Sequence, residues 1–209
     1  MERIIREDLV DLSRVVELGQ IETLVSLLPE RVGTLLGRAS LRETLEVAFA
    51  TVERWLRLLE ELYVCFRLKP YHKGNAKSLR KESKLYLWDY YPVQSAGARF
   101  ENLIALHLLK ACNYWSDSGL GNFELFYLRD KGQREVDFLI TNDSKPWVAV
   151  EVKLDDLQPT PHFKAFSEIL SKCKLVCQVV KRDNYYRQHQ FKNGKVTVIS
   201  AAALCGKLV

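Results

Sequence analysis

Two neighbouring apolar runs in the middle of the sequence carry charged residues of the types that bind metal ions. Asp137 lies in the first run, residues 134–140, and Glu151-Val152-Lys153 ends the second. Side chains two residues apart in a strand point to the same face, so Glu151 and Lys153 should project together. If the runs pair as neighbouring strands, Asp137 lies beside Glu151 at one edge of a buried sheet. These carboxylates would suit Mg²⁺ or Mn²⁺, because Mg²⁺ takes oxygen ligands and is commonly held by one or two carboxylates.

The same residues also have purely structural explanations. Asp137 and Lys153 could form an ion pair at the end of a sheet, and Glu135 could face solvent or compete with Asp137 for the site. Glu151 is harder to explain in this way, because polar groups on a buried strand need partners. The 4 histidines show no metal-ligand spacing and the 5 cysteines contain no CxxC pair, so reduced, mostly buried thiols are expected.

Basic residues are concentrated in two segments, although the net charge is only +5. Residues 67–84 contain seven basic residues and one acid, and residues 181–195 contain a second basic group around two tyrosines. Basic segments with aromatic residues favour a polyanion partner such as DNA, whereas a solvated loop could have the same composition. The residues expected to contact DNA in the first segment are Lys73, Lys77, Arg80, Lys81 and Lys84.

The first part of the chain, residues 1–94, is predicted to be a helical domain that ends in a winged helix. Apolar residues at helical spacing indicate helices over residues 7–37, with a break at Pro29. Ser40 and Glu43 form a capping-box pattern that should open a helix reaching about residue 50.

The winged-helix prediction depends on the segment that follows. Thr51 is placed to cap another helix, and alternating runs at residues 63–68 and 84–88 indicate a hairpin. Helices followed by a hairpin are typical of winged helices, with the basic segment at the tip of the wing. Winged helices bind DNA or serve as protein-binding modules, and the sequence favours neither.

The second part, residues 95–209, is predicted to mix helices and strands. An amphipathic helix of roughly four turns begins near Gly97 and carries Glu101, which is either a site residue or an exposed helix residue. Three strands, a helix and two strands follow, and Asp155 and Asp156 are placed to cap that helix. Their predicted ranges are 124–128, 135–140, 147–153, 161–171, 174–180 and 196–200.

This order of elements, with acids at those positions, resembles the PD-(D/E)XK nuclease superfamily, and at the level of the fold the archaeal Holliday-junction resolvases. The matching residues are Glu101, Asp137, Glu151 and Lys153. Nearly the whole chain is also similar to the C-terminal region, DUF4143, of certain prokaryotic AAA-type ATPases. The short motifs that carry this second similarity are residues 100–102, 128–131, 134–138 and 150–153.

The resemblance implies that the winged-helix domain is followed in the chain by a restriction-endonuclease-like mixed sheet flanked by helices, which is an α+β or α/β fold. It also implies roles for the acidic residues. Asp137 and Glu151 would ligate Mg²⁺ or Mn²⁺ together with the Val152 carbonyl. Lys153 would orient the attacking water or stabilise the transition state, and Glu101 would complete the metal shell. The residues expected to contact phosphate beside this site are Gln133 and Arg134.

Proteins of this kind normally carry an N-terminal ATPase domain, but the sequence has no G-x-x-x-x-G-K-[ST] loop. We therefore expect a fragment or a shortened relative that does not hydrolyse ATP and whose partners are an ATPase domain and double-stranded or branched DNA. One function that follows is a Mg²⁺-dependent endodeoxyribonuclease. Another is a catalytically inactive DNA- or protein-binding regulatory module. A third, protein recognition in toxin–antitoxin or defence systems, predicts no salt-dependent DNA affinity.

The sequence also bears on location. No apolar run approaches the roughly 20 residues of a membrane-spanning helix, and the first residues lack the apolar stretch of a secretory signal. We therefore expect a cytoplasmic protein with no membrane partner.

Overall fold

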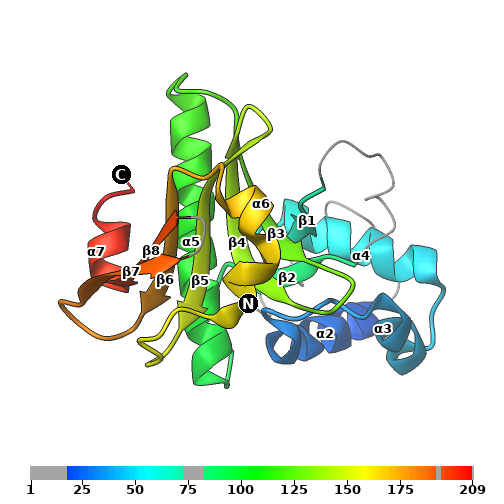
Figure 1. Cartoon of the computed structure of the whole chain (residues 1–209). Helices are drawn as coiled ribbons and strands as arrows, with labels where there is room; N and C mark the ends of the chain where they lie inside the picture. Colours follow the sequence, from blue (N-terminus) through cyan, green and yellow to red (C-terminus); the bar gives the residue numbers. More distant parts are fainter. Residues whose placement is uncertain (1–17, 73–81, 192–193, 209) are drawn as a thin grey trace.

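The computed structural model describes residues 18–72, 82–191 and 194–208. Within them, one sheet of eight strands runs in the order β2-β1-β3-β4-β5-β6-β8-β7 (Figure 1). The strands are β1 Cys65–Pro70, β2 Lys84–Leu87, β3 Phe123–Arg129, β4 Glu135–Asn142, β5 Lys145–Lys153, β6 Leu175–Val180, β7 Tyr186–Phe191 and β8 Gly194–Ser200. The helices are α2 Leu18–Leu27, η1 Pro29–Arg31, α3 Arg38–Leu45, α4 Phe49–Glu61, α5 Ala96–Asp117, η3 Pro161–Phe166, α6 Ser167–Leu170 and α7 Ala201–Cys205.

The central strands β4 and β5 form because their sequences can be buried on both faces. Residues 136–141 and 148–152 are buried without interruption, which is typical of strands covered on both sides. β3, β4 and β5 pair antiparallel, whereas β5 pairs parallel with β6 and β6 parallel with β8. This confirms the predicted mixed sheet flanked by helices.

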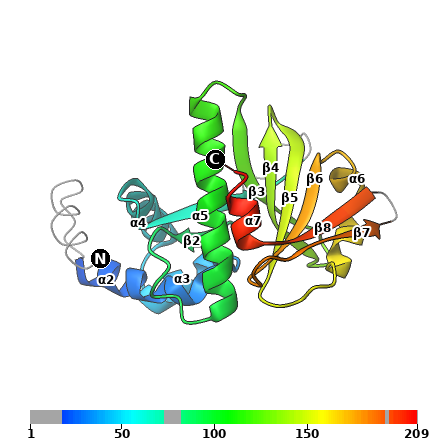
Figure 2. The same cartoon turned by 90° about the vertical axis from the view of Figure 1, so that its left-hand side faces the viewer.

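Helices cover the two faces of the sheet unequally. Figure 2 shows α5 and α7 along one face and α6 on the other. The side chains that α5 buries recur every three or four residues, as expected for a helix that packs one stripe on a sheet; they include Phe100, Ile104, Leu108 and Ala111. On the opposite face a smaller core forms around Phe163, Phe166 and Leu170 of η3 and α6.

The predicted hairpin is present, and it belongs to the same sheet as the second half of the chain. β1 and β2 pair antiparallel, and β1 also pairs in parallel with β3, with Lys69 opposite Phe126 and Pro70 opposite Tyr127. The outer edge of β2 is covered by the chain before α3, where Gly33 N donates to Leu85 O at 3.1 Å. The hairpin therefore extends the main sheet. The predicted wing-tip residues Lys73, Lys77, Arg80 and Lys81 lie outside the described residues.

The predicted starts of two N-terminal helices were wrong. α3 begins at Arg38, directly after Gly37, whose φ of 59° turns the chain earlier than the capping-box pattern suggested. Ser40 lies inside α3 and accepts a hydrogen bond from Arg31 Nη2 at 3.2 Å. Thr51 likewise lies inside α4, which follows Ala48 without a side-chain cap.

Two further differences concern the second half. α5 has 22 residues, about six turns at 3.6 residues per turn, and is longer than predicted. β7 was not predicted, because residues 186–191 are mostly polar and lack an alternating apolar pattern. It pairs with β8 as an edge strand. No helix in the described parts of the chain is both long and apolar enough to span a bilayer.

Candidate functional site

Asp137 and Glu151 lie side by side on β4 and β5, as the sequence predicted. Phe138 pairs with Val150 in the antiparallel register, so the two acidic residues are direct cross-strand neighbours. Val152 N donates to Asp137 Oδ2 at 2.9 Å, and Asp137 N donates to Glu151 Oε2 at 3.4 Å. Both side chains are buried. The backbone of each strand thus holds the carboxylate of the other.

Lys153 projects to the same side as Glu151, which confirms the reasoning from strand periodicity. Its Nζ lies 2.7 Å from Glu151 Oε1. The side chain of Lys153 is 38% exposed, whereas that of Glu151 is 3% exposed. Lys153 therefore reaches the buried carboxylate from the solvent side.

Glu101 joins this group from α5 and is not a simple exposed helix residue. Tyr86 Oη donates to Glu101 Oε1 at 2.8 Å. Asn102, the next residue, fixes α5 against β2, because it accepts from Leu87 N at 2.8 Å and donates to Leu87 O at 2.7 Å. Gly33 leaves room for the carboxylate, since a Cβ at that position would lie 3.0 Å from both carboxylate oxygens of Glu101.

Lys84 occupies the centre of the group, where three carboxylates meet. Its Nζ lies 3.2 Å from Glu101 Oε1, 2.5 Å from Glu135 Oε1 and 3.4 Å from Asp137 Oδ1. The side chain is 2% exposed, so the predicted role of Lys84 as a surface contact for DNA does not fit its position. The sequence held a signal for this, because a lysine at the start of the buried strand Lys84–Leu87 needs acidic partners.

Glu135 links this centre to the surface. Its second oxygen accepts a hydrogen bond from Arg129 Nη1 at 2.8 Å while its first contacts Lys84. Glu135 thus shares Lys84 with Asp137. We call the following set the carboxylate–lysine cluster: Lys84, Glu101, Glu135, Asp137, Glu151 and Lys153.

Acidic groups outnumber basic ones around the cluster even when Arg129 is counted with it. Burial, followed by the charge of Asp137, raises the pKa of Glu101 to about 7 and the pKa of Glu151 to about 8. Burial alone would lower the pKa of Lys84, but Glu101, Asp137 and Glu135 together raise it, so its ammonium stays charged.

The cluster has oxygen donors suited to a cation, but Lys84 already supplies that cation. The two oxygens of Asp137 contact Lys84 Nζ and Val152 N, and those of Glu151 contact Lys153 Nζ and Asp137 N. Among the described residues, no group of three or more His, Cys, Asp or Glu side chains is arranged to hold a metal ion. The predicted Mg²⁺ or Mn²⁺ ion on Asp137, Glu151 and Val152 therefore does not fit this arrangement.

Gln133 and Arg134 lie in the exposed turn before β4. Gln133 adopts a positive φ of 61°. Arg134 is paired with Asp130, with Nε 2.7 Å and Nη2 2.6 Å from Asp130 Oδ2. A phosphate would have to share this guanidinium with Asp130.

Gln178 is a structural residue that the sequence reasoning missed. It is fully buried on β6 and binds the loop that follows Lys153. Its Nε2 donates to Asp156 O at 2.6 Å and Gln158 O at 2.9 Å, and its Oε1 accepts from Thr160 N at 2.8 Å. Thr160 caps η3 instead of the predicted Asp155 or Asp156. A glutamine inside the apolar strand Leu175–Val180 was the available signal.

Comparison with known families gives two matches. Residues 96–204 match the model of DUF4143, a domain of unknown function, and residues 1–91 match DUF8612, also a domain of unknown function. No curated protein and no solved structure matches the chain.

Proposed function

Because this chain belongs to the DUF4143 family, which is described only as a domain of unknown function, we propose a function from the site itself. The chain is a DNA-binding module built on a PD-(D/E)XK nuclease-like sheet. Its catalytic centre is closed, because the ammonium group of Lys84 occupies the carboxylates that would otherwise bind a metal ion. Of the three functions that the sequence suggests, it is the DNA-binding regulatory module and not the active nuclease.

The nuclease-like part of the proposal is supported by where four residues come from. Glu101 lies on the helix that precedes the sheet, Asp137 on β4, and Glu151 and Lys153 two residues apart on β5. All four belong to one cluster, with Asp137 raising the pKa of both Glu101 and Glu151. Chance pairing on a sheet does not explain why the helix also contributes an acid.

The position of Lys84 is the observation that supports a catalytic centre closed to metal ions. Hydrolysis of a phosphodiester with Mg²⁺ requires carboxylate oxygens that are free to bind the ion. In this structure the Lys84 ammonium contacts three of the carboxylates and is 2% exposed. A cation that is covalently part of β2 cannot diffuse away as a hydrated ion can. The buried ion pairs therefore favour binding without cleavage.

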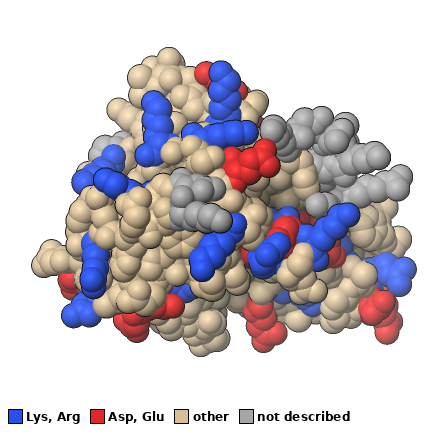
Figure 3. Space-filling model, viewed as in Figure 1, with Lys and Arg blue, Asp and Glu red and all other residues tan. Residues whose placement is uncertain are grey.

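The surface supports a polyanion partner. On the face seen in Figure 3, Lys and Arg side chains are spread over the whole surface, and Asp and Glu side chains lie among them in the centre and along the lower margin. The net charge of +5 attracts a polyanion through its phosphates and makes binding depend on salt.

The test uses supercoiled plasmid, a four-way junction and a linear duplex, each with and without Mg²⁺ or Mn²⁺. The proposal predicts metal-independent binding that weakens as salt rises, and no cleavage of any substrate. Absence of any salt-dependent binding would overturn the DNA-binding part.

Nuclease activity remains the second candidate, because Asp137, Glu151 and Lys153 converge as that chemistry requires. It predicts cleavage in Mn²⁺ by the wild-type chain that disappears in Asp137→Ala and Lys153→Ala. That result would show that, in solution, the Lys84 ammonium moves away from the carboxylates and a metal ion can bind them. The closed-centre proposal would then be wrong.

A further inference from the structure

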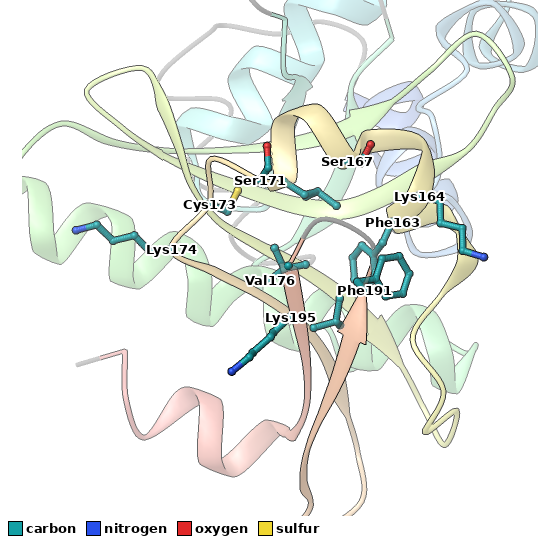
Figure 4. A pocket seen from close by; sticks show the side chains of 12 residues that line it. Phe163, Lys164, Ser167, Ser171, Cys173, Lys174, Val176, Phe191 and Lys195 are labelled. Carbon is teal, nitrogen blue, oxygen red and sulfur yellow. The ribbon is translucent and has the colours of Figure 1, made fainter.

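A large hollow lies on the less covered face of the sheet, away from α5 and α7. Its volume is about 830 Å³, and it exists because α6 has only four residues and leaves part of β6 and β8 uncovered. Leu170, Val176 and Val196 line it together with two aromatic rings. Those rings, Phe163 and Phe191, meet edge to face with centroids 6.2 Å apart (Figure 4).

Lysines from three different segments surround this apolar lining. Lys164 comes from η3, Lys174 from the loop before β6, and Lys195 from β8, and all three are exposed. Figure 4 shows them on separate sides of the hollow, with the hydroxyls of Ser167 and Ser171 at its α6 side. We call Lys164, Lys174 and Lys195 the pocket rim.

We propose that this pocket binds an unpaired nucleotide of a single-stranded nucleic acid. The proposal rests on the proposed DNA-binding function and specifies its substrate. An apolar, partly aromatic lining accepts the face of a base, as in other single-strand-binding proteins, where stacking is combined with a basic path for the backbone. In a duplex the faces of the bases are stacked on one another and cannot enter.

The distribution of charge favours a nucleic acid over an acidic protein segment. Because the rim lysines lie on separate sides, they can contact phosphates before and after an inserted base. The hydroxyl of Ser167 can donate and accept hydrogen bonds, and that of Ser171, which already donates to Glu168 O at 3.1 Å, can accept one from a base edge or a sugar. A protein segment would need a separate acidic side chain for each of the three lysines, whereas the backbone of a nucleic acid carries a phosphate at every nucleotide.

The test measures fluorescence anisotropy of 5′-fluorescein-labelled dT12, alone and annealed to dA12, over a series of salt concentrations without metal. The rim variant is Lys164→Glu/Lys174→Glu/Lys195→Glu. The control is Lys110→Glu/Lys145→Glu/Lys207→Glu, which changes the charge equally at other exposed positions. Circular dichroism and thermal melts verify that both variants fold.

We expect the rim variant to bind dT12 at least tenfold more weakly than the control. Each lost phosphate contact flattens the slope of log affinity against log salt by about 0.7 on a single strand, so three contacts amount to about 2. Phe191→Ala should weaken dT12 by about tenfold, within the range measured for base stacking, and leave the duplex unaffected.

Equal binding of dT12 by the rim and control variants, or equal weakening of dT12 and the duplex, would overturn this inference alone. Rim-dependent binding of a fluorescein-labelled peptide of alternating Glu and Phe, with no binding of dT12, would assign the pocket to an acidic protein segment instead. If neither dT12 nor the duplex binds, the proposed DNA-binding function fails as well.

Discussion

Lys84 and its acidic neighbours depend on one another. A buried ammonium is costly unless its charge is paired, and here Glu101, Glu135 and Asp137 pair it. Breaking such a buried group by removing one partner typically costs about 3–5 kcal/mol, because the remaining charges are left uncompensated. Lys153 is 38% exposed, so its ammonium keeps part of its hydration and its pairing with Glu151 is partly screened by solvent. Removing Lys84 should therefore destabilise the fold more than removing Lys153, although both lysines contact acids of the carboxylate–lysine cluster.

The raised pKa values of Glu101 and Glu151 predict a pH-dependent stability. Both carboxyls have an ordinary pKa of 4.5 and titrate near about 7 and about 8 in the folded protein. Between these limits the folded state binds more protons than the unfolded state, so the free energy of unfolding falls as the pH rises. The contribution of these two carboxyls to stability is fully present below about pH 4.5 and is lost as the pH rises through about 7 for Glu101 and about 8 for Glu151.

Thermal melts of Glu101→Gln and Glu151→Gln between about pH 5 and pH 8 test this. Each substitution keeps the side chain neutral, so the Tm of the variant should fall less with pH than that of the wild type. The difference is at most about 1.4 kcal/mol per pH unit and carboxyl, or roughly 3–6 °C for a chain of this size. Parallel pH profiles in the wild type and both variants would show that these carboxyls are not buried as described.

At the scale of elements, α5 and β2 are held together by one polar side chain. Asn102 is fully buried and bonds both the N–H and the C=O of Leu87. This contact places Glu101 beside Lys84 and Tyr86, which lie 17 and 15 residues before it in the sequence. The site therefore depends on the docking of α5 as much as on the strands.

Asn102→Ala should lower the free energy of unfolding by about 2–4 kcal/mol, because two buried backbone groups of Leu87 lose their partner and each costs about 1–3 kcal/mol. Asn113→Ala, on an exposed part of the same helix, should change it by less than about 0.5 kcal/mol. Urea unfolding measures both. Equal effects of the two substitutions would mean that Asn102 does not anchor α5.

The elements that could be predicted from the sequence are those with a clear apolar period. β3, β4, β5, β6 and β8 were found within a few residues, because burial of their side chains leaves a continuous or alternating apolar pattern. Helix starts were missed where a glycine in the left-handed region, Gly37, turned the chain before a capping residue. β7 was missed because an exposed edge strand needs no apolar pattern.

At the scale of the whole molecule, the boundary expected between residues 94 and 95 does not separate two sheets. β1 pairs with β3 across that boundary, and β2 supplies Lys84 and Tyr86 to a cluster whose acids lie on α5, β4 and β5. Asp137 and Glu151 could be predicted from strand spacing, since they lie on the neighbouring strands β4 and β5, whereas the role of Glu101 on α5 was indicated only by the family resemblance. The strand pattern around Lys84 indicated that this lysine needs acidic partners, but not which ones, because its contact with Asp137 spans 53 residues and depends on how the hairpin joins the sheet.

This continuity predicts that the chain unfolds in a single cooperative transition. Trp55 is buried among the N-terminal helices, and Trp115 and Trp147 pack against each other in the second half. The variant Trp55→Phe/Trp88→Phe keeps Trp115 and Trp147, which report on the second half of the chain. The variant Trp115→Phe/Trp147→Phe keeps Trp55 and Trp88, which report on the first half. In each variant, the urea midpoints from tryptophan fluorescence and from circular dichroism should coincide. Separate midpoints for the two halves would mean that they fold independently.

The most direct test of the account is whether a divalent ion and Lys84 exclude each other. Thermal melts of the wild type and of Lys84→Met are recorded with increasing Mn²⁺, with Lys153→Met as the control. A ligand that binds only the folded state adds about 2.7 kcal/mol at a concentration 100 times its Kd. We predict that Mn²⁺ leaves the Tm of the wild type and of Lys153→Met unchanged and raises that of Lys84→Met. A Mn²⁺-dependent rise in the wild type would contradict the claim that Lys84 closes the carboxylate centre.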